Sequence, residues 1–299
     1  MATRIGILTG GGDVPGLNSV IKSVVYRATE MDYEVFGIRR GWEGLTHLRA
    51  GPDPDPDYIR PLDRRTTRAI DRTGGTVLHT SRTNPGQMKA SRLPEHLDPI
   101  RLRAYETAEG TYDLTPLVLE NLERLGIQRL VAIGGDDTLG YGHRLGAEGV
   151  SLVAIPKTMD NDVQGTEYCI GFSSAVTRAR ELINRQRTTL GSHERIGVFR
   201  IFGRNSGYTA WYAAYVTSAR CVIPEASFDL DALADLLISG VSGRMVAIRE
   251  GKYDHAPLPD PELRPRRIDV ARMYNTARLR PQYADKLGWP LLLGPRHDD

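Results

Sequence analysis

A regular alternation of short β-branched runs with amphipathic helical runs is the feature of this sequence that most constrains its fold. Strand-like runs fall at residues 4–10, 33–41, 127–135, 150–156 and 195–203, and helical patterns fall at 11–32, 114–126, 136–149 and 173–192. This alternation is typical of βαβ units, in which helices cover both faces of a parallel sheet. We therefore predict an α/β fold with a mainly parallel sheet. Ligands of such sheets bind at the carboxyl ends of the strands, where the glycine clusters of this chain lie.

Composition argues against several other classes of protein. The 299 residues are 40% hydrophobic and carry a net charge of +2. A net charge this small gives no reason to expect nucleic acid or a membrane surface as partner. No apolar run approaches the length of a transmembrane helix, and a predicted strand stands where a signal peptide would lie. Cys169 and Cys221 lack disulfide or metal-ligand spacing, so we interpret both as buried thiols. We expect a cytoplasmic protein.

The first candidate site is the glycine-rich run TGGGDVPGLN at residues 9–18, directly after the first predicted strand. Its glycines let backbone N–H groups approach an anion closely, and the helix that follows adds a favourable dipole. The run matches neither the Walker A motif nor the dinucleotide-binding fingerprint. Taken alone, it is either a phosphate-binding turn or only a tight connection between a strand and a helix.

The second candidate is IGGDDTLG at residues 133–140, again at a strand end that opens a helix. Asp136 and Asp137 offer carboxylate oxygens, the ligands that Mg²⁺ prefers, beside flexible glycines. The competing interpretation is helix capping, because an aspartate at a helix start stabilises free N–H groups without any ligand. On this run alone, both interpretations stay open.

The third candidate is IPKTMDND at residues 155–162, which completes a further predicted strand. Asp160 or Asp162 could accept a proton from a substrate hydroxyl, and Lys157 could neutralise charge on a transferring phosphoryl group. An Asx-type turn, for which Asn161 is well suited, would explain the same residues. Repetition favours a site, because three successive strand ends carry glycine or polar residues suited to phosphate and metal.

Six motifs occur in the order and approximate spacing of the phosphofructokinase family, namely GILTGGGDVPGLN, IGGDDT, PKTMDND, GTEYCIGFSSA, SHERIGV and FGRNSG. The chain resembles that family from residue 4 to about residue 228. Other kinases share a GGDGT-like loop but lack the TxDND and GR-x-x-G partners. The resemblance implies two Rossmann-like lobes with mainly parallel sheets and the active site in the cleft between them. Residues 1–155 would form the phosphoryl-donor lobe and 156–240 the sugar-phosphate lobe, while 241–299 would return to the first lobe.

The same resemblance assigns the donor side of the site. Gly12 and Arg82 would contact the phosphoryl donor, and Asp136 would hold Mg²⁺. In ATP-using relatives, glycine occupies the positions of Asp137 and Lys157, but some ATP-dependent relatives also carry lysine at the second position. Asp137 therefore decides the donor assignment. Here Asp137 would place a carboxylate where the α-phosphate of ATP must lie, which excludes ATP by size and by like charge. Lys157 would supply a cation for the transferring phosphate, so we assign both residues to catalysis and to donor binding.

On the acceptor side, the resemblance makes Asp160 the base that deprotonates the 1-hydroxyl of the sugar. Arg195 matches an arginine that family members donate across a subunit interface to the sugar 6-phosphate, which implies a homodimer or homotetramer. The other substrate-binding positions are Thr158, Met159, Asp162, Phe202, Gly203 and Arg204. Phe202 replaces the methionine usual in the family, and we expect a mild effect because the site there uses backbone and Arg204.

These assignments predict a Mg²⁺-dependent pyrophosphate:fructose 6-phosphate 1-phosphotransferase, with pyrophosphate and fructose 6-phosphate as its substrates. Because no nucleotide is cleaved, the reaction should run close to equilibrium and be usable in both directions. An ATP-dependent 6-phosphofructokinase is the alternative within the family.

The resemblance breaks after about residue 237, where a family segment of several dozen residues with further sugar-phosphate ligands has no counterpart. We expect the natural chain to contain this segment, because deleting central strands from a parallel sheet would leave exposed edges and unsatisfied backbone groups. If the segment is truly absent, we expect a non-catalytic paralogue that binds phosphosugars.

Overall fold

The computed structural model describes residues 3–49, 51, 54–203, 205–226, 267–277 and 279–283. The chain divides into two compact units, unit 1 at Met1–Thr158 and unit 2 at Met159–Asp299. Each unit has its own cluster of buried apolar side chains. Within the residues that the structure describes, no helix is both long enough and apolar enough to span a membrane.

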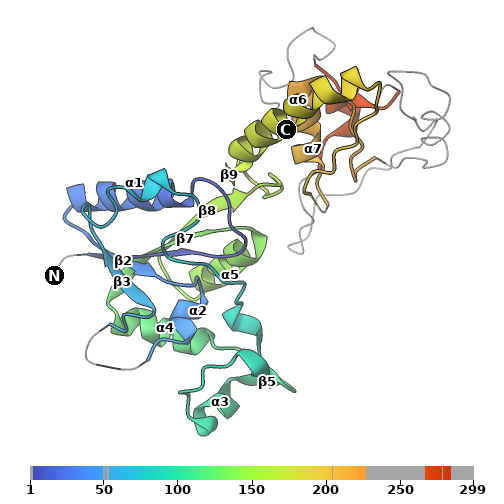
Figure 1. Ribbon diagram of the computed structural model, residues 1–299. Helices are drawn as coiled ribbons and strands as arrows, with labels where there is room; N and C mark the ends of the chain where they lie inside the picture. The colour runs from blue at the N-terminus through green and yellow to red at the C-terminus, as the bar shows by residue number, and fades with distance from the viewer. Residues whose placement is uncertain are drawn as a thin grey trace. The chain divides into compact units, whose positions relative to one another are not determined.

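Unit 1 is built on a sheet whose strands lie in the order β3-β2-β1-β7-β8 (Figure 1). β1 (Arg4–Thr9), β2 (Glu34–Ile38), β7 (Ile127–Gly134) and β8 (Leu152–Thr158) pair in parallel, while β3 (Ile59–Leu62) runs antiparallel to β2. β1 lies at the centre and is buried along most of its length. The α/β fold with a mainly parallel central sheet, predicted from the alternation, is confirmed.

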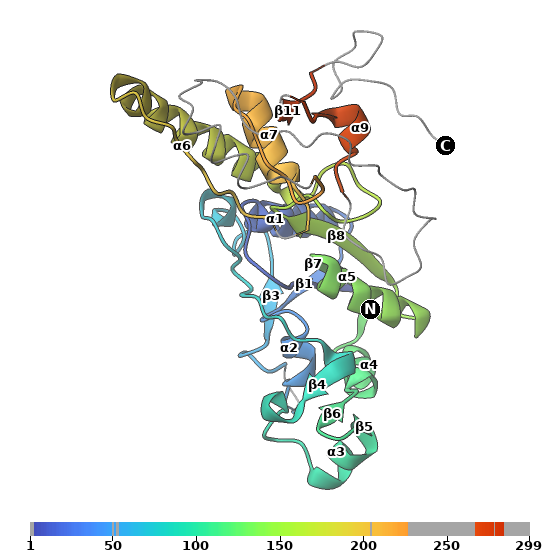
Figure 2. The same cartoon turned by 90° about the vertical axis from the view of Figure 1, so that its right-hand side faces the viewer.

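Helices cover both faces of this sheet, because parallel neighbours need crossover connections. α1 (Leu17–Glu30) lies on the opposite side of the sheet from α2 (Glu43–Thr46) and α4 (Thr115–Arg124), and α5 (Asp136–Ala147) connects β7 to β8 (Figures 1 and 2). α1 begins after Gly16, whose φ of 101° is a left-handed conformation that favours glycine. The helices predicted at 11–32, 114–126 and 136–149 are therefore present with shorter bounds.

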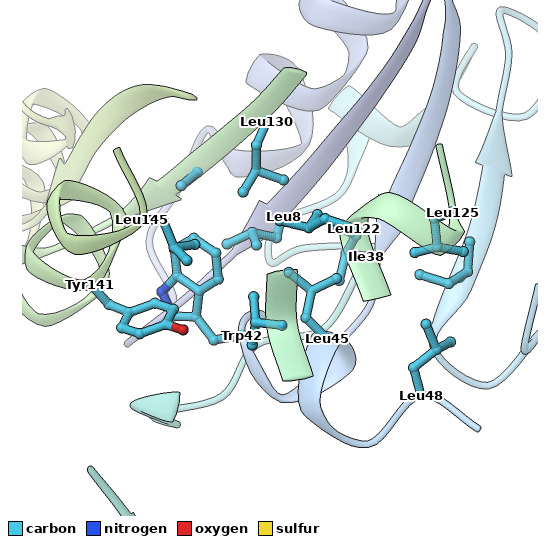
Figure 3. Packing of buried hydrophobic residues seen from close by; sticks show 13 residues of the cluster. Leu8, Ile38, Trp42, Leu45, Leu48, Leu122, Leu125, Leu130, Tyr141 and Leu145 are labelled. Atoms are coloured by element: carbon cyan, nitrogen blue, oxygen red, sulfur yellow. The ribbon is translucent and has the colours of Figure 1, made fainter. Parts of the chain in front are cut away.

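The main core of unit 1 lies between the sheet and the helices α2, α4 and α5 (Figure 3). Trp42 is 2% exposed and packs edge-on against Tyr141, with 5.0 Å between the ring centroids. Its indole Nε1 donates a hydrogen bond to the carbonyl oxygen of Thr138, 3.3 Å away. Truncating a buried aromatic side chain to alanine typically costs about 3–5 kcal/mol. Since this packing holds the first turn of α5, the core supports the strand end where the second candidate motif lies.

Between β3 and α4, unit 1 carries a small subdomain that the sequence patterns did not predict. β4 (Met88–Lys89), β6 (Thr111–Tyr112) and β5 (Glu106–Ala108) form an antiparallel sheet in the order β4-β6-β5, and α3 (Pro99–Tyr105) precedes β5. Short 3₁₀ helices in the same part of the chain are η1 (Ile70–Arg72), η2 (Pro85–Gln87) and η3 (Ala90–Arg92). Strands this short give little periodic signal, which explains why the patterns missed them.

Unit 2 contains two longer helices that pack together, α6 (Phe172–Ser192) and α7 (Tyr208–Thr217). α6 confirms the helix predicted at 173–192. Trp211 of α7 is fully buried and donates a hydrogen bond from Nε1 to the carbonyl oxygen of Met273, 2.8 Å away. Both cysteines are buried thiols, as predicted. The short elements of this unit are β9 (Ile170–Gly171), α9 (Val270–Met273), β10 (Tyr274–Asn275) and β11 (Arg280–Pro281), the last two paired antiparallel.

The structure contradicts one predicted element, the strand at residues 195–203. No part of this stretch is a strand, and most of its apolar side chains are exposed, Val198 by 86% and Phe202 by 57%. A strand needs a hydrogen-bonded neighbour, and none of the described residues pairs with this stretch. Its β-branched composition was therefore not sufficient to form a strand.

The expected return of residues 241–299 to the first lobe falls largely outside the described residues. Ile268, Tyr274 and Leu279 lie in that range and pack in the core of unit 2. The three-part division of the chain stays a prediction.

Candidate functional site

The glycine-rich turn after β1 is held by hydrogen bonds from two sides. The N–H of Gly10 donates to the carbonyl oxygen of Ile133 (2.9 Å), and the N–H of Gly11 donates to the carbonyl oxygen of Ser81 (2.8 Å). The hydroxyl of Thr80 donates to the carbonyl oxygen of Gly11 (2.7 Å). Gly11 has a φ of +80°, a conformation that residues with a side chain rarely adopt. The turn is thus fixed between the end of β7 and the segment at residues 80–81.

Thr138 packs against two of the glycine runs at once. A Cβ atom added to Gly10 would lie 2.5 Å from Thr138 Oγ1, and one added to Gly134 would lie 2.2 Å from Thr138 Cβ. The close approach of this one side chain therefore requires glycine at both positions. Since Trp42 bonds to the carbonyl oxygen of Thr138, the core fixes the spacing between the two glycine runs.

Lys157, near the end of β8, reaches the glycine turn. It is 4% exposed, and a Cβ atom added to Gly11 would lie 3.1 Å from its Nζ. Burial, the largest influence, lowers the pKa of Lys157; the carboxylate of Asp13 opposes this shift, and the guanidinium of Arg82 adds to it. A Cβ atom added to Gly12 would lie 4.0 Å from Arg82 Nη2. The predicted donor residues Gly12, Arg82 and Lys157 thus lie together, with two cations beside exposed backbone, an arrangement suited to a polyphosphate anion.

Asp136 and Asp137 lie in the first turn of α5, after Gly135 as the N-cap, and both are exposed. Because Gly135 is the N-cap, neither aspartate caps the helix, and their charge only complements the helix dipole. Exposed carboxylate oxygens also suit Mg²⁺, which needs only one or two protein carboxylates when it is bound together with substrate phosphates. Asp136 therefore fits the predicted metal role. Within the described ranges, no group of three or more His, Cys, Asp or Glu side chains could hold a metal ion by itself.

The residues that follow β8 form a turn at the start of unit 2. Asn161 is 1% exposed and has a φ of 54°. Its Nδ2 donates to the carbonyl oxygen of Glu167 (2.8 Å), and its Oδ1 accepts from the N–H of Cys169 (2.9 Å). These bonds fix the turn that carries Asp160, itself only 7% exposed. The turn interpretation and the site interpretation of this motif therefore describe the same loop.

Two buried hydroxyls near the start of α7 hold the same turn. Thr209 Oγ1 donates to the carbonyl oxygen of Met159 (2.8 Å), and Ser206 Oγ donates to the carbonyl oxygen of Asp160 (3.4 Å). Ser206 is 1% exposed and Thr209 2%. Sequence reasoning gave neither residue a role, although Ser206 lies inside the FGRNSG motif. The bond from Ser206 joins positions 46 residues apart, which no local pattern can reveal.

Gly203 is the one residue of the predicted FGR segment whose identity the structure explains. Its φ is 156°, and a Cβ atom added there would lie 2.7 Å from the carbonyl oxygen of Ser206. Close approach of the backbone therefore requires glycine. Phe202 is exposed, as noted above, and Arg204 lies outside the described residues.

The remaining predicted substrate positions are Thr158 and Asp162, both half-buried beside the turn, and Arg195. Arg195 is exposed just beyond the end of α6, where its N–H donates to the carbonyl oxygen of Leu190 (2.9 Å). A solvent-exposed arginine is compatible with a role toward a partner subunit, which stays a prediction.

Glu225 is a further residue that the motifs missed. Its carboxylate accepts hydrogen bonds from the N–H of Gly207 (2.9 Å) and from the N–H of Ile268 (3.1 Å). A carboxylate is favoured at the start of a helix, so Glu225 stabilises the N-terminus of α7 next to Ser206. It joins residues far apart in the chain, and no local sequence signal marks it.

Comparison with known proteins identifies relatives of this chain. A family model described as Phosphofructokinase matches residues 4–276. The pyrophosphate–fructose 6-phosphate 1-phosphotransferase of Streptomyces coelicolor is 38% identical over 79% of this chain and 60% of its own length. The ATP-dependent 6-phosphofructokinase of Aquifex aeolicus is 40% identical over 75% of this chain and 61% of its own length. The chain therefore spans about 60% of the length of these relatives.

Solved structures share the fold. The phosphofructokinase of Pichia pastoris in the T-state matches with a TM-score of 0.63 at 21% identity, covering 80% of this chain and 23% of that one. The pyrophosphate-dependent phosphofructokinase of Marinobacter aquaeolei matches with a TM-score of 0.59 at 17% identity, covering 80% of this chain and 57% of that one. At these identities the likeness concerns the fold alone.

The burial of Lys157 leads to a prediction about stability. Because the pKa of Lys157 is lower in the folded chain than the ordinary value of about 10.4, the unfolded chain binds more protons between the two values. The penalty of burying the charge is therefore complete below the folded pKa, and stability rises with pH from there toward the ordinary value. We expect Lys157→Met to raise the free energy of unfolding near pH 7 by roughly 1 kcal/mol.

Urea unfolding of the wild type and Lys157→Met between pH 7 and pH 10 measures this effect. The difference between the two proteins should shrink as the pH rises, since the methionine side chain of the variant cannot titrate. Lys89→Met, at an exposed lysine of the subdomain, is the matched control and should show no such trend. A loss of stability in Lys157→Met at neutral pH would contradict the inference.

Proposed function

The chain belongs to the phosphofructokinase family, and from this premise we propose that it transfers a phosphoryl group from pyrophosphate to the 1-hydroxyl of fructose 6-phosphate. The observation that carries the proposal is the burial of the Lys157 ammonium against the glycine turn, next to Arg82. Two cations and exposed backbone in one place suit the high charge density of pyrophosphate. Relatives that bear the name of a pyrophosphate enzyme support the proposal.

Donor selection is assigned to Asp137. It lies in the first turn of α5, directly after Asp136, and both carboxylates are exposed. If Asp136 holds Mg²⁺ on the donor phosphates, Asp137 places a second negative charge next to them, which disfavours a donor that extends into an α-phosphate. When bound, Mg²⁺ would neutralise charge on the donor phosphates.

The acceptor chemistry is assigned to Asp160. Its backbone is fixed by Asn161 and by the hydroxyl of Ser206, so the carboxylate is presented from a rigid turn. Asp160 takes the proton of the 1-hydroxyl while the sugar oxygen bonds to the nearer phosphorus of pyrophosphate. The bond from that phosphorus to the bridging oxygen breaks, and orthophosphate leaves with the electron pair. Lys157 and Arg82 offset the charge that gathers on the leaving phosphate.

Recognition of the sugar phosphate would rest on the backbone and side chains after β8 and before α7. We assign it to Thr158, Met159, Asp162, Phe202, Gly203 and Arg204. Arg195 would reach the sugar 6-phosphate of a partner subunit, so we propose a homodimer or homotetramer.

Two other functions have a specific observation in their favour. A cavity of about 350 Å³ lies beside Arg82, with Glu43 and Arg92 in its wall, and gives room next to the donor arginine that a nucleoside could use. This favours an ATP-dependent phosphofructokinase, the name carried by the Aquifex aeolicus relative. The chain spans about 60% of the length of these relatives. If the natural protein truly lacks the segment after about residue 237, it would be a non-catalytic phosphosugar-binding protein, because the sugar ligands of that segment would be missing.

Exchange of Asp137 tests the donor assignment. With Mg²⁺ and fructose 6-phosphate, the wild type should show a higher kcat/KM for pyrophosphate than for ATP. Asp137→Gly should raise kcat/KM for ATP at least about tenfold, equivalent to ~1.4 kcal/mol. Asp137→Asn keeps the size and removes the charge, so it separates steric from electrostatic exclusion. Faster turnover of the wild type with ATP than with pyrophosphate would contradict the donor assignment. Absence of turnover with either donor would favour the non-catalytic alternative.

Exchange of Asp160 tests the base. Asp160→Asn should lower kcat by about 10²–10⁴-fold, the usual contribution of a general base, while the Kd for pyrophosphate stays within a factor of about three. Asp162→Asn, on the same turn, is the matched control and should lose less activity. Turnover of Asp160→Asn within about tenfold of the wild type would show that another group takes the proton.

A further inference from the structure

A second cavity in unit 1 contains none of the proposed donor residues, and it shares His47 and Arg92 with the cavity beside Arg82. Its volume is about 610 Å³, inside the range of about 300–1,000 Å³ that small-molecule sites occupy. One wall comes from the segment between α2 and β3, with His47, Arg49 and Tyr58. The other wall comes from the subdomain around η3, with Arg92 and His96. Because elements distant in the sequence form its walls, the cavity is a product of the tertiary fold.

Cationic groups dominate this cavity. Arg49 and Arg92 carry permanent charges, and Glu95 is the one acidic side chain among the described residues of the wall. The wall is therefore positive even when both histidines are neutral. Among the described residues, the salt bridges involve other basic side chains and neither of these two arginines. The two guanidinium groups are thus available to an anion.

Burial is the main influence on both histidines of the cavity. It lowers the pKa of His96, and the nearby Arg49 adds to that shift. Burial also lowers the pKa of His47, where Glu43 opposes the shift and His96 adds to it. The hydroxyls of Tyr58 and Ser91 add one hydrogen-bond donor to each wall.

We propose that this cavity binds a small anion that carries a phosphate group, with Arg49 and Arg92 as its principal ligands. Guanidinium groups match phosphate oxygens in pairs, and hydroxyl and imidazole groups can satisfy the remaining oxygens. The volume leaves room for an organic part beyond the phosphate, next to Leu93. None of these residues belongs to the donor and acceptor assignments, although His47 and Arg92 also line the cavity beside Arg82 that the ATP-dependent alternative would use.

Titration calorimetry at pH 7 tests the proposal with inorganic phosphate and ribose 5-phosphate as probes. The measurements use the full chain with Lys157→Met, which weakens the proposed donor site. In this background Arg49→Gln should weaken probe binding at least about tenfold, the effect of losing a charge-assisted hydrogen bond. Glu95→Gln should tighten it roughly two- to fivefold, because it removes a repulsive charge from the wall. A gain of affinity cannot arise from misfolding.

Arg103→Gln is the matched control, because Arg103 is an exposed arginine of α3 that lines neither cavity. It should leave probe binding unchanged within about twofold. Tighter binding of ribose 5-phosphate than of phosphate would assign the site to phosphate esters, and equal binding would assign it to the phosphate group alone. Absence of binding by both probes, or equal losses in Arg49→Gln and Arg103→Gln, would overturn the proposal.

Discussion

The contact between the Lys157 ammonium and the glycine turn after β1 is the one on which the rest of the unit 1 site depends. A buried ammonium is costly unless negative charge or polar groups approach it. Gly11 allows that approach because a Cβ atom there would lie 3.1 Å from Nζ. Thr138 packs against Gly10 and Gly134 and so fixes the spacing between the glycine turn after β1 and the end of β7. The glycines thus serve the placement of one charged side chain as well as the shape of the turn.

In unit 2, side-chain hydrogen bonds fix the turn that carries Asp160. Asn161 closes its turn with two side-chain hydrogen bonds, and buried hydroxyls at the start of α7 hold the backbone on either side of Asp160. Each of these bonds is worth about 1 kcal/mol, so the turn is over-determined compared with an ordinary surface loop. In the proposed reaction, preorganised charges and a fixed base supply what a loose phosphoryl-transfer transition state requires.

Much of this could be predicted from the sequence, because the relevant signals are local. Apolar periodicity predicted α1, α5 and α6, and glycine or acidic residues at strand ends predicted where Gly12, Asp136 and Lys157 lie. The strand at 195–203 failed because strand formation depends on a partner elsewhere in the chain. Thr138, Ser206 and Glu225 escaped notice for a related reason: each acts on backbone that is brought close only by the fold.

The reverse reaction offers the most direct test of the central claim, that the donor site serves pyrophosphate and needs no nucleotide. The purified protein, Mg²⁺, fructose 1,6-bisphosphate and orthophosphate are mixed without nucleotide and followed by phosphorus NMR. We expect pyrophosphate to form as the sugar 1-phosphate is lost, in equal molar amounts. Absence of pyrophosphate, with ATP formed only after ADP is added, would contradict it.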